Sequence, residues 1–191
     1  GLIICNIGDG KGKTTAAIGT AIRASGAGLS VHIIQFVKSK GSPTKHKSKG
    51  GEWPLSAEVE FLNNLIIPKG SGPITIEQVG LGFVGILGDN KTKVAHIDAA
   101  ILGLESAREA IHSKRYDVII LDEIISAVEL GLLTENDVVG LISRKNPALH
   151  LVLTGHNKFA KIFDNCDIVT NMQMIKHPYY QGILAQRGID Y

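Results

Sequence analysis

Near the start of the chain, a turn rich in glycine and lysine separates an apolar run from a helix-forming segment. Residues 2–7 are almost entirely apolar, residues 8–15 read GDGKGKTT, and residues 14–25 carry apolar side chains on one side of a helical repeat. A short apolar run that ends at glycine is typical of a buried strand in a parallel sheet. We therefore expect a strand, a tight turn and a helix, the context in which such a turn binds phosphate.

The turn has the chemistry of a polyphosphate site. Glycines let backbone amides point inward, and the N-terminus of the next helix adds positive potential. Lys13 is expected to place its ammonium on phosphate oxygens, and the Thr14 hydroxyl is expected to coordinate Mg²⁺. The turn is shorter than the usual pattern, because Ile7 stands before Gly12 at the spacing where a glycine is usual. A plain Gly-Lys turn is the alternative interpretation.

A second polar site is expected after the apolar run 118–121, which ends at Asp122 and Glu123. Beside a phosphate loop, a carboxylate in this place faces the magnesium ion, which prefers oxygen ligands. We expect at least one of the two carboxylates to reach the metal. Helix capping is the alternative role for this pair.

Strand-like and helix-like segments alternate along most of the chain. This alternation predicts an α/β protein with a single P-loop (RecA-like) domain, residues 1–191, and a mostly parallel sheet of about six strands with helices on both faces. Ligands are expected at the carboxyl ends of the strands. The expected strands are 2–7, 30–37, 58–62, 116–121, 149–154 and 167–172, the expected helices are 14–25, 92–113, 135–143 and a short one near Phe159, and 68–90 is expected to be a long irregular loop.

Composition limits the kinds of partner and the cellular compartment that we expect for this chain. Hydrophobic residues make up 44% and charged residues 20%, as in folded soluble proteins. The net charge of +2 does not indicate nucleic acid binding, and no apolar run approaches the roughly 18 to 20 residues that cross a bilayer. Cys5 and Cys166 are too few for a disulfide scaffold, so we expect two buried thiols and a cytoplasmic location.

Several classes of P-loop protein compete at this point. A GTPase needs a guanine-reading Asn-Lys-x-Asp, but the similar string at residues 157–160 reads NKFA. A thymidine kinase of the related fold needs four zinc-binding cysteines, and this chain has 2. A RecA-like NTPase or kinase that cleaves phosphate stays open on the residues alone, as does a binding module that holds its ligand without turnover.

Several separated blocks resemble the ATP:corrinoid adenosyltransferases of the short-P-loop type, and the resemblance extends over nearly the whole chain. Residues 6–15, NIGDGKGKTT, are similar to the shortened phosphate loop of that family. The other blocks are Arg23-Ala24, Gln35-Phe36-Val37-Lys38, Gly80-Leu81-Gly82-Phe83, Leu121-Asp122-Glu123, Lys176-His177-Pro178, Gly182, Ala185-Gln186 and Gly188-Ile189-Asp190-Tyr191.

The resemblance implies a reaction and its participants. The 5'-deoxyadenosyl group of ATP would move to the Co(I) centre of a reduced corrinoid, with release of tripolyphosphate, in the biosynthesis or salvage of adenosylcobalamin. Mg²⁺ is the implied cofactor. The implied partners are ATP, a corrinoid such as cobalamin, cobinamide or a cobyrinic acid derivative, an electron-donating flavoprotein and a second copy of the chain, whereas neither nucleic acid nor a membrane is expected.

Family position also implies the site residues. Those implied to bind ATP are Asn6, Gly8, Asp9, Gly10, Lys11, Gly12, Lys13, Thr14, Thr15, Arg23 and His177. Those implied to bind the metal are Thr14, Asp122 and Glu123, those implied to bind the corrinoid are Gly82 and Phe83, and those implied to support catalysis are Lys13, Glu123 and Phe83.

Three of these residues have structural alternatives. Phe83 resembles the residue that packs against the lower face of the corrinoid and displaces its axial ligand, and a plain core phenylalanine is the alternative. For Arg23 the alternative is an ordinary arginine on a helix surface. For His177 it is a structural histidine.

Three departures from the family pattern bear on the site. Gly85 stands where a tryptophan is usual, and His156 stands where an arginine usually follows Thr-Gly. Residues 38–51 form a lysine-rich segment unlike the family, which we expect to be a mobile, solvated surface loop. A grip on phosphate or on corrinoid side chains is the alternative for this segment.

Overall fold

The computed structural model describes residues 1–39, 56–86, 89–186 and 188–189. The strands are β1 (Ile3–Ile7), β2 (Val31–Ser39), β3 (Ile74–Gly80), β4 (Val118–Asp122), β5 (His150–Thr154) and β6 (Ile168–Asn171). The helices are α1 (Lys13–Gly26), α2 (Ala57–Asn63), α3 (Lys93–His112), α4 (Ile124–Glu129), α5 (Glu135–Ile142), α6 (Ala160–Phe163) and the 3-10 helix η1 (Pro178–Gln181).

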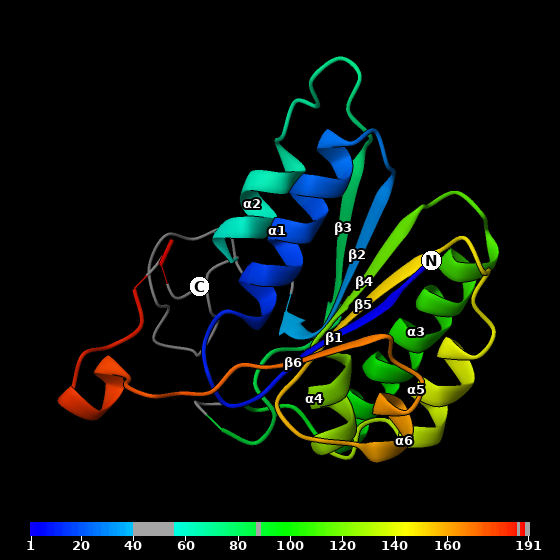
Figure 1. Cartoon of the computed structure of the whole chain (residues 1–191). Coiled ribbons are helices and arrows are strands. Elements are labelled where there is room, and N and C mark those ends of the chain that lie inside the picture. Colours follow the sequence, from blue (N-terminus) through cyan, green and yellow to red (C-terminus); the bar gives the residue numbers. More distant parts are fainter. Residues whose placement is uncertain (40–55, 87–88, 187, 190–191) are drawn as a thin grey trace.

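The strands form one 6-stranded sheet in the order β3-β2-β4-β5-β1-β6. Every neighbouring pair is parallel, as expected when helices connect successive strands. α1 and α2 cover one face of the sheet, and α3, α4, α5 and α6 cover the other (Figure 1). The predicted α/β fold with a mostly parallel sheet and helices on both faces is confirmed.

The two faces bury separate apolar layers, because successive side chains of a strand point to opposite faces. In β4, Ile120 packs in the layer beneath α1, and Leu121 packs in the layer beneath α3. α3 approaches the sheet closely, since a Cβ atom on Gly103 would lie 2.5 Å from Cγ2 of Val79. Glycine at this position lets α3 lie tightly against β3.

The prediction of a strand at 58–62 was wrong, because these residues lie in α2. Val59 and Leu62 are both buried, at a spacing that places them on one face of a helix. Ser56 occupies the N-cap position, and Glu58 and Glu60 lie in the first turn, where acidic side chains favour a helix. The short apolar pattern at 58–62 fits the repeat of a strand as well as that of a helix. The N-cap and the acidic first turn favour the helix.

The prediction that 68–90 is an irregular loop was wrong in part, because this segment contains β3. β3 pairs in parallel with β2, with Ile74 opposite Val31 and Ile76 opposite Ile33. The glycines on both sides of β3 suggest a loop, because the pairing with β2 that stabilises this strand is not visible in the local sequence. Helix α4, which was not expected, is short and is buried from Ile124 to Val128, so it has no polar face to mark its period.

The lysine-rich segment begins later than expected. Lys38 and Ser39 are the last residues of β2, and residues 40–51 lie outside the described residues. Of the two thiols, Cys5 is buried, but Cys166 lies just before β6 and is only partly buried, so the expectation of two buried thiols is met by Cys5 alone.

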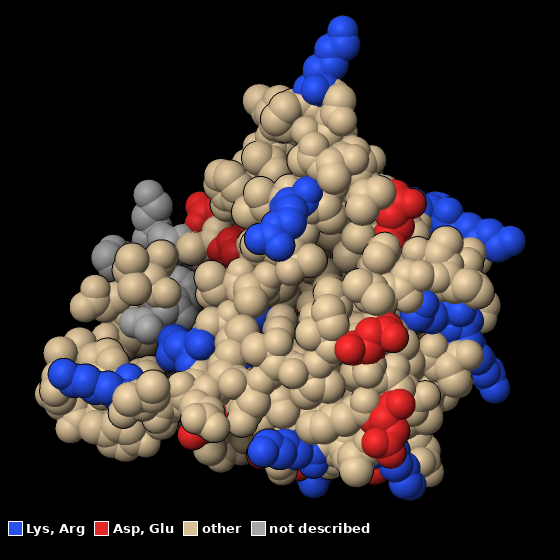
Figure 2. All heavy atoms as spheres, in the orientation of Figure 1, with Lys and Arg blue, Asp and Glu red and all other residues tan. Residues whose placement is uncertain are grey.

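Two further observations concern helices that could span a membrane and the distribution of charge on the surface. Among the described residues, no helix combines the length and the apolar character needed to cross a membrane. On the face shown in Figure 2, acidic and basic side chains are dispersed among uncharged ones.

Candidate active site

A row of polar side chains crosses the sheet at its carboxyl edge, on the face covered by α1. Gln35 of β2 lies opposite Gln78 of β3 and opposite Asp122 of β4. Thr154 of β5 lies opposite Asn6 of β1. All of them are buried, with exposed fractions between 0% and 7%. The preceding layer on this face is apolar, so the row marks where the core ends and the site begins.

Asp122 is the centre of this polar row. Its Oδ1 accepts hydrogen bonds from the hydroxyls of Thr14, at 2.9 Å, and Thr154, at 2.7 Å. Its Oδ2 accepts a hydrogen bond from Nε2 of Gln35 at 3.0 Å, and Oε1 of Gln35 accepts one from Nε2 of Gln78 at 3.0 Å. The structure therefore brings together Thr14 and Asp122, from two motifs far apart in the sequence.

Lys13 places a cation inside the glycine-rich turn. Its Nζ donates hydrogen bonds to the carbonyl oxygens of Gly8, at 2.6 Å, and Gly10, at 2.8 Å. Burial lowers the pKa of Lys13, although the carboxylates of Glu123 and Asp9 oppose this effect. The ammonium thus lies within the curve of the turn, where a phosphate-binding lysine is needed.

The turn is held by its neighbours and by its own backbone conformation. Gly8 and Gly12 both have φ of 107°, in the left-handed region that favours glycine. The amide of Gly8 donates to the carbonyl of His156 at 3.0 Å, and the amide of Gly10 donates to the carbonyl of Met172 at 2.8 Å. The first amides of α1 have no partner within the helix, so they are available to an anion.

Glu123 combines an unusual backbone conformation with an unfavourable electrostatic environment. Its φ of 62° lies in the left-handed region, and its amide donates to the hydroxyl of Thr154 at 2.7 Å. Burial, and then the neighbouring Asp122, raise the pKa of Glu123 to about 7, whereas Lys38 and Lys13 oppose this effect. Strained backbone and a perturbed carboxylate at one position are typical of functional sites.

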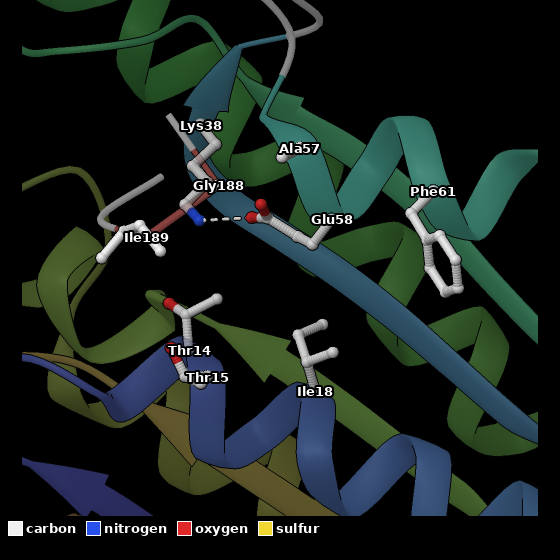
Figure 3. Close-up of a pocket in the computed structure, with 9 residues that line it drawn as sticks. All are labelled: Thr14, Thr15, Ile18, Lys38, Ala57, Glu58, Phe61, Gly188 and Ile189. Carbon is white, nitrogen blue, oxygen red and sulfur yellow. Dashed lines mark hydrogen bonds and ion pairs between the residues drawn. The ribbon is translucent and has the colours of Figure 1, made fainter. Parts of the chain in front are cut away.

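A cavity of about 310 Å³ opens between the start of α1 and α2 (Figure 3). Nζ of Lys38 pairs with Oε1 of Glu58 at 2.7 Å on its wall. Although burial lowers the pKa of Lys38, the carboxylates of Asp122 and Glu58 outweigh burial and raise it. The cavity is lined by Thr14, Thr15, Ile18, Lys38, Ala57, Glu58, Phe61, Gly188 and Ile189.

Gly82 and Phe83 follow β3 at the same carboxyl edge of the sheet. The amide of Gly82 donates to the carbonyl of Val37 at 2.9 Å, and Gly82 has φ of 101°. The next residue, Phe83, is 41% exposed, whereas Val84 packs against the core. This exposure is greater than expected of a core phenylalanine.

The structure does not bring every residue implied to bind ATP to the phosphate loop. Arg23 is exposed in the last turn of α1, about 13 Å along the helix axis from Thr14. Nδ1 of His177 accepts a hydrogen bond from the amide of Tyr179 at 3.1 Å, which caps η1. Thr15 borders the cavity beside Thr14. The two remaining residues of the turn, Asp9 and Lys11, are exposed.

Two of the three departures from the family pattern, Gly85 and His156, lie near the site. Gly85 has φ of 70°, and a Cβ atom there would meet no heavy atom of the described residues within 4 Å. Among the described residues, no atom therefore blocks a first side-chain carbon at the position where the family has tryptophan. His156 follows β5 beside the phosphate loop, where partial burial and the charge of Lys13 lower the pKa of His156.

Oxygen atoms of Thr14, Asp122 and Glu123 form a donor set that suits Mg²⁺. Within the described ranges, however, no group of three or more histidine, cysteine, aspartate or glutamate side chains forms a metal site. A magnesium ion bound here would therefore also need oxygens from the phosphates of a nucleotide, as is common for this metal.

Gln35, Gln78 and Thr154 were not expected to be site residues. Their signal in the sequence is that each places a polar side chain near the carboxyl end of a strand whose preceding residues on the same face are apolar. That Gln35 lies between Gln78 and Asp122 follows only from the strand order and the register.

Comparisons with known proteins identify the family. The family model described as "ATP:corrinoid adenosyltransferase BtuR/CobO/CobP" matches residues 1–191. A corrinoid adenosyltransferase of Sinorhizobium sp is 31% identical over 193 residues, covering 100% of this chain and 80% of that protein. Corrinoid adenosyltransferases of Escherichia coli strain K12, at 30% identity, and of Salmonella typhimurium strain LT2, at 29%, each match 100% of this chain and 86% of their own length.

Among solved structures, the EssC ATPases 2 and 3 from Geobacillus thermodenitrificans overlay with a TM-score of 0.41 at 13% identity, over 100% of this chain and 35% of that one. This low similarity supports no statement about function. The full-length match to the family model, together with the curated relatives, establishes that the chain belongs to the ATP:corrinoid adenosyltransferase family.

Proposed function

We propose that this protein transfers the 5'-deoxyadenosyl group of ATP to the Co(I) centre of a corrinoid and releases tripolyphosphate, in the biosynthesis or salvage of adenosylcobalamin. The contact between the Thr14 hydroxyl and the Asp122 carboxylate carries the proposal, because it joins the phosphate loop to the strand whose carboxylates we propose as metal ligands. Membership of the family over the whole chain supports the reaction class.

In the proposed reaction, an electron pair of Co(I) forms the bond to C5' of ATP. The bond between C5' and its phosphate oxygen breaks, and its electrons leave on tripolyphosphate. The protein therefore has to align two ligands and stabilise a departing polyanion, without itself supplying a nucleophile. Lys13 and the first amides of α1 supply positive charge and hydrogen-bond donors at the phosphate loop.

Mg²⁺ is the proposed cofactor. The Thr14 hydroxyl and the Glu123 carboxylate would hold it, with Asp122 either as a ligand or as the acceptor that orients Thr14. The ion would supply further positive charge to the triphosphate. The pKa of Glu123 is about 7. A cation bound nearby would lower this pKa and so favour the charged carboxylate.

The cavity beside Thr14 is the proposed place of the adenosine moiety. It begins where the triphosphate would end, and it offers the apolar side chains of Ile18 and Phe61 to a flat ring (Figure 3). The corrinoid would then approach from the side of Gly82 and Phe83, which lie at the same edge of the sheet.

The remaining assignments are proposals that depend on the family. We propose a single domain that forms a homodimer in the cytoplasm and receives electrons from a flavoprotein, because Co(I) must be produced by reduction of Co(II). The unpaired thiols Cys5 and Cys166 are compatible with a reducing compartment. Exposed apolar residues near the C-terminal end, such as Ile175 and Leu184, supply surface for a second copy.

One experiment separates the proposed function from its rivals. The protein is incubated with ATP, Mg²⁺ and chemically reduced cobalamin, and the products are analysed in the dark. A light-sensitive cobalt-carbon product together with tripolyphosphate is the expected outcome. ADP without an alkylated cobalt would indicate an NTPase or a kinase, and tight binding without any product would indicate a binding module.

A further inference from the structure

Asp89 is the centre of a small, buried hydrogen-bond cluster between β3 and α3. Its Oδ2 accepts from the amide of Gly85 and pairs with Nε2 of His96, both at 2.9 Å, and its Oδ1 accepts from the amide of Lys91 at 3.0 Å. The side chains of His96 and Asp89 are 2% and 4% exposed. The backbone amides of Gly85 and Lys91 lower the pKa of Asp89 to about 2, so the carboxylate is charged at neutral pH.

His96 connects this cluster to a fixed element. It lies in the first turns of α3, directly after the cap in which the hydroxyl of Thr92 accepts from the amide of Ala95 at 3.2 Å. Further along the same helix, Gly103 lies against Val79 of β3. The imidazole therefore extends from a helix that is held against the sheet.

The connection from β3 to α3 is thus fixed at two points. At its beginning, the amide of Gly82 donates to the carbonyl of Val37 in β2. At its end, Asp89 is bonded to His96. Phe83 lies between these two points, 41% exposed, and Gly85, with φ of 70°, gives its amide to Asp89.

We propose that His96 and Asp89 are positioning residues, which fix the orientation in which Phe83 is presented to the corrinoid. This inference rests on the proposed function, because it assigns the pair to the corrinoid and not to ATP. The physical reason is that a buried carboxylate with three donors allows few conformations of the backbone that it joins. Loss of the imidazole leaves a buried carboxylate underpaired and releases one end of the connection.

The test compares His96→Ala with His96→Gln, whose amide nitrogen can replace the donor, and with His112→Ala on the exposed end of the same helix. For His96→Ala we expect the KM for cob(I)alamin to rise roughly tenfold while the KM for ATP changes less than about twofold, as for loss of one hydrogen bond to a charged group. The Gln variant should recover most of this loss, and His112→Ala should behave as the wild type.

A second readout does not depend on turnover. Hydrogen exchange at the amides of Gly85 and Lys91 should be slow in the wild type and faster in His96→Ala, because both amides donate to Asp89. Unchanged exchange in folded His96→Ala would show that the pair does not hold the connection. Faster exchange with equal changes in both KM values would give the pair a general structural role, and either result overturns the inference. A wild type that produces ADP would instead overturn the proposed function, while the exchange measurement would still report on the pair.

Discussion

The two ends of the proposed site, the phosphate end around Asp122 and the corrinoid end around Phe83, are built in different ways. At the phosphate end, buried side chains on strands converge on Asp122, which is 1% exposed. At the corrinoid end, the 41% exposed Phe83 lies on a glycine-containing connection that hydrogen bonds fix at its two ends. Charge on a departing polyanion is stabilised by groups that are already in place, whereas a large flat ligand needs an accessible apolar surface. The difference predicts that substitutions at the two ends affect different ligands.

The largest effect is expected at the phosphate end, from Lys13→Ala. Removal of the Lys13 ammonium, which lies inside the glycine-rich turn, should weaken ATP binding by roughly 100-fold or more, which corresponds to about 3 kcal/mol. Titration calorimetry with Mg-ATP measures this loss, and Lys69→Ala, on an exposed connection, is the matched control. Unchanged affinity would contradict the assignment of the phosphate loop.

Glu123→Gln tests whether a charged carboxylate at the phosphate end destabilises the fold. The pKa of Glu123 is raised from 4.5 to about 7, so its contribution to stability is present at low pH and is lost as the pH rises through about 7. Without metal and nucleotide, the variant should therefore gain stability over the wild type between pH 5 and pH 8, by about 2 kcal/mol.

Urea unfolding at both pH values measures this difference. The control is Glu129→Gln at the exposed end of α4, which makes the same chemical change on the surface. A constant difference between the Glu123 variant and the wild type across this pH range would show that Glu123 is not held in an unfavourable environment.

Gln35→Leu tests the polar row beneath Asp122. The change leaves Oδ2 of Asp122 and Nε2 of Gln78 without a buried partner, which should destabilise the fold by about 1 to 3 kcal/mol. Mg-ATP affinity should fall several-fold, because Asp122 also accepts from Thr14. Chemical unfolding and calorimetry measure the two effects, with the exposed Gln181→Leu as control. An unaltered affinity would restrict the row to a structural role.

The smallest effect on ATP is expected at the corrinoid end, from Phe83→Ala. Turnover of cobalamin should fall roughly fivefold to tenfold, and the Kd for ATP should stay within about twofold, because Phe83 follows β3 and does not line the cavity proposed for adenosine. Initial rates with reduced cobalamin in excess give the first quantity, and calorimetry gives the second. Equal activity would remove Phe83 from the mechanism, and a parallel loss of ATP affinity would remove the distinction between the two ends.

The phosphate end was largely predictable from sequence because its signals are local. The turn from Gly8 to Thr15 and the carboxylates Asp122 and Glu123 each follow an apolar strand directly, and in the folded sheet the Thr14 hydroxyl donates to Asp122 at 2.9 Å. The roles assigned to these residues stay predictions.

The corrinoid side was less predictable because its structure depends on distant partners. β3 is stabilised by pairing with β2, and the bond between Asp89 and His96 joins the residues after β3 to helix α3. The polar row likewise depends on the register of neighbouring strands, so Gln35 acquires its partner Asp122 only in the folded sheet.

The polar row has a mechanical consequence for the whole molecule. It links Gln78, in the strand that leads to Phe83, through Gln35 to Asp122 and from there to the hydroxyl of Thr14. One continuous chain of hydrogen bonds therefore connects the two proposed substrate-binding ends. A displacement of the outer strand β3 would be transmitted along it to Thr14 at the start of α1. Substitutions in β3 that adapt the protein to a bulkier or smaller corrinoid would thus have to preserve these hydrogen bonds. Otherwise the corrinoid would no longer be aligned with the nucleotide.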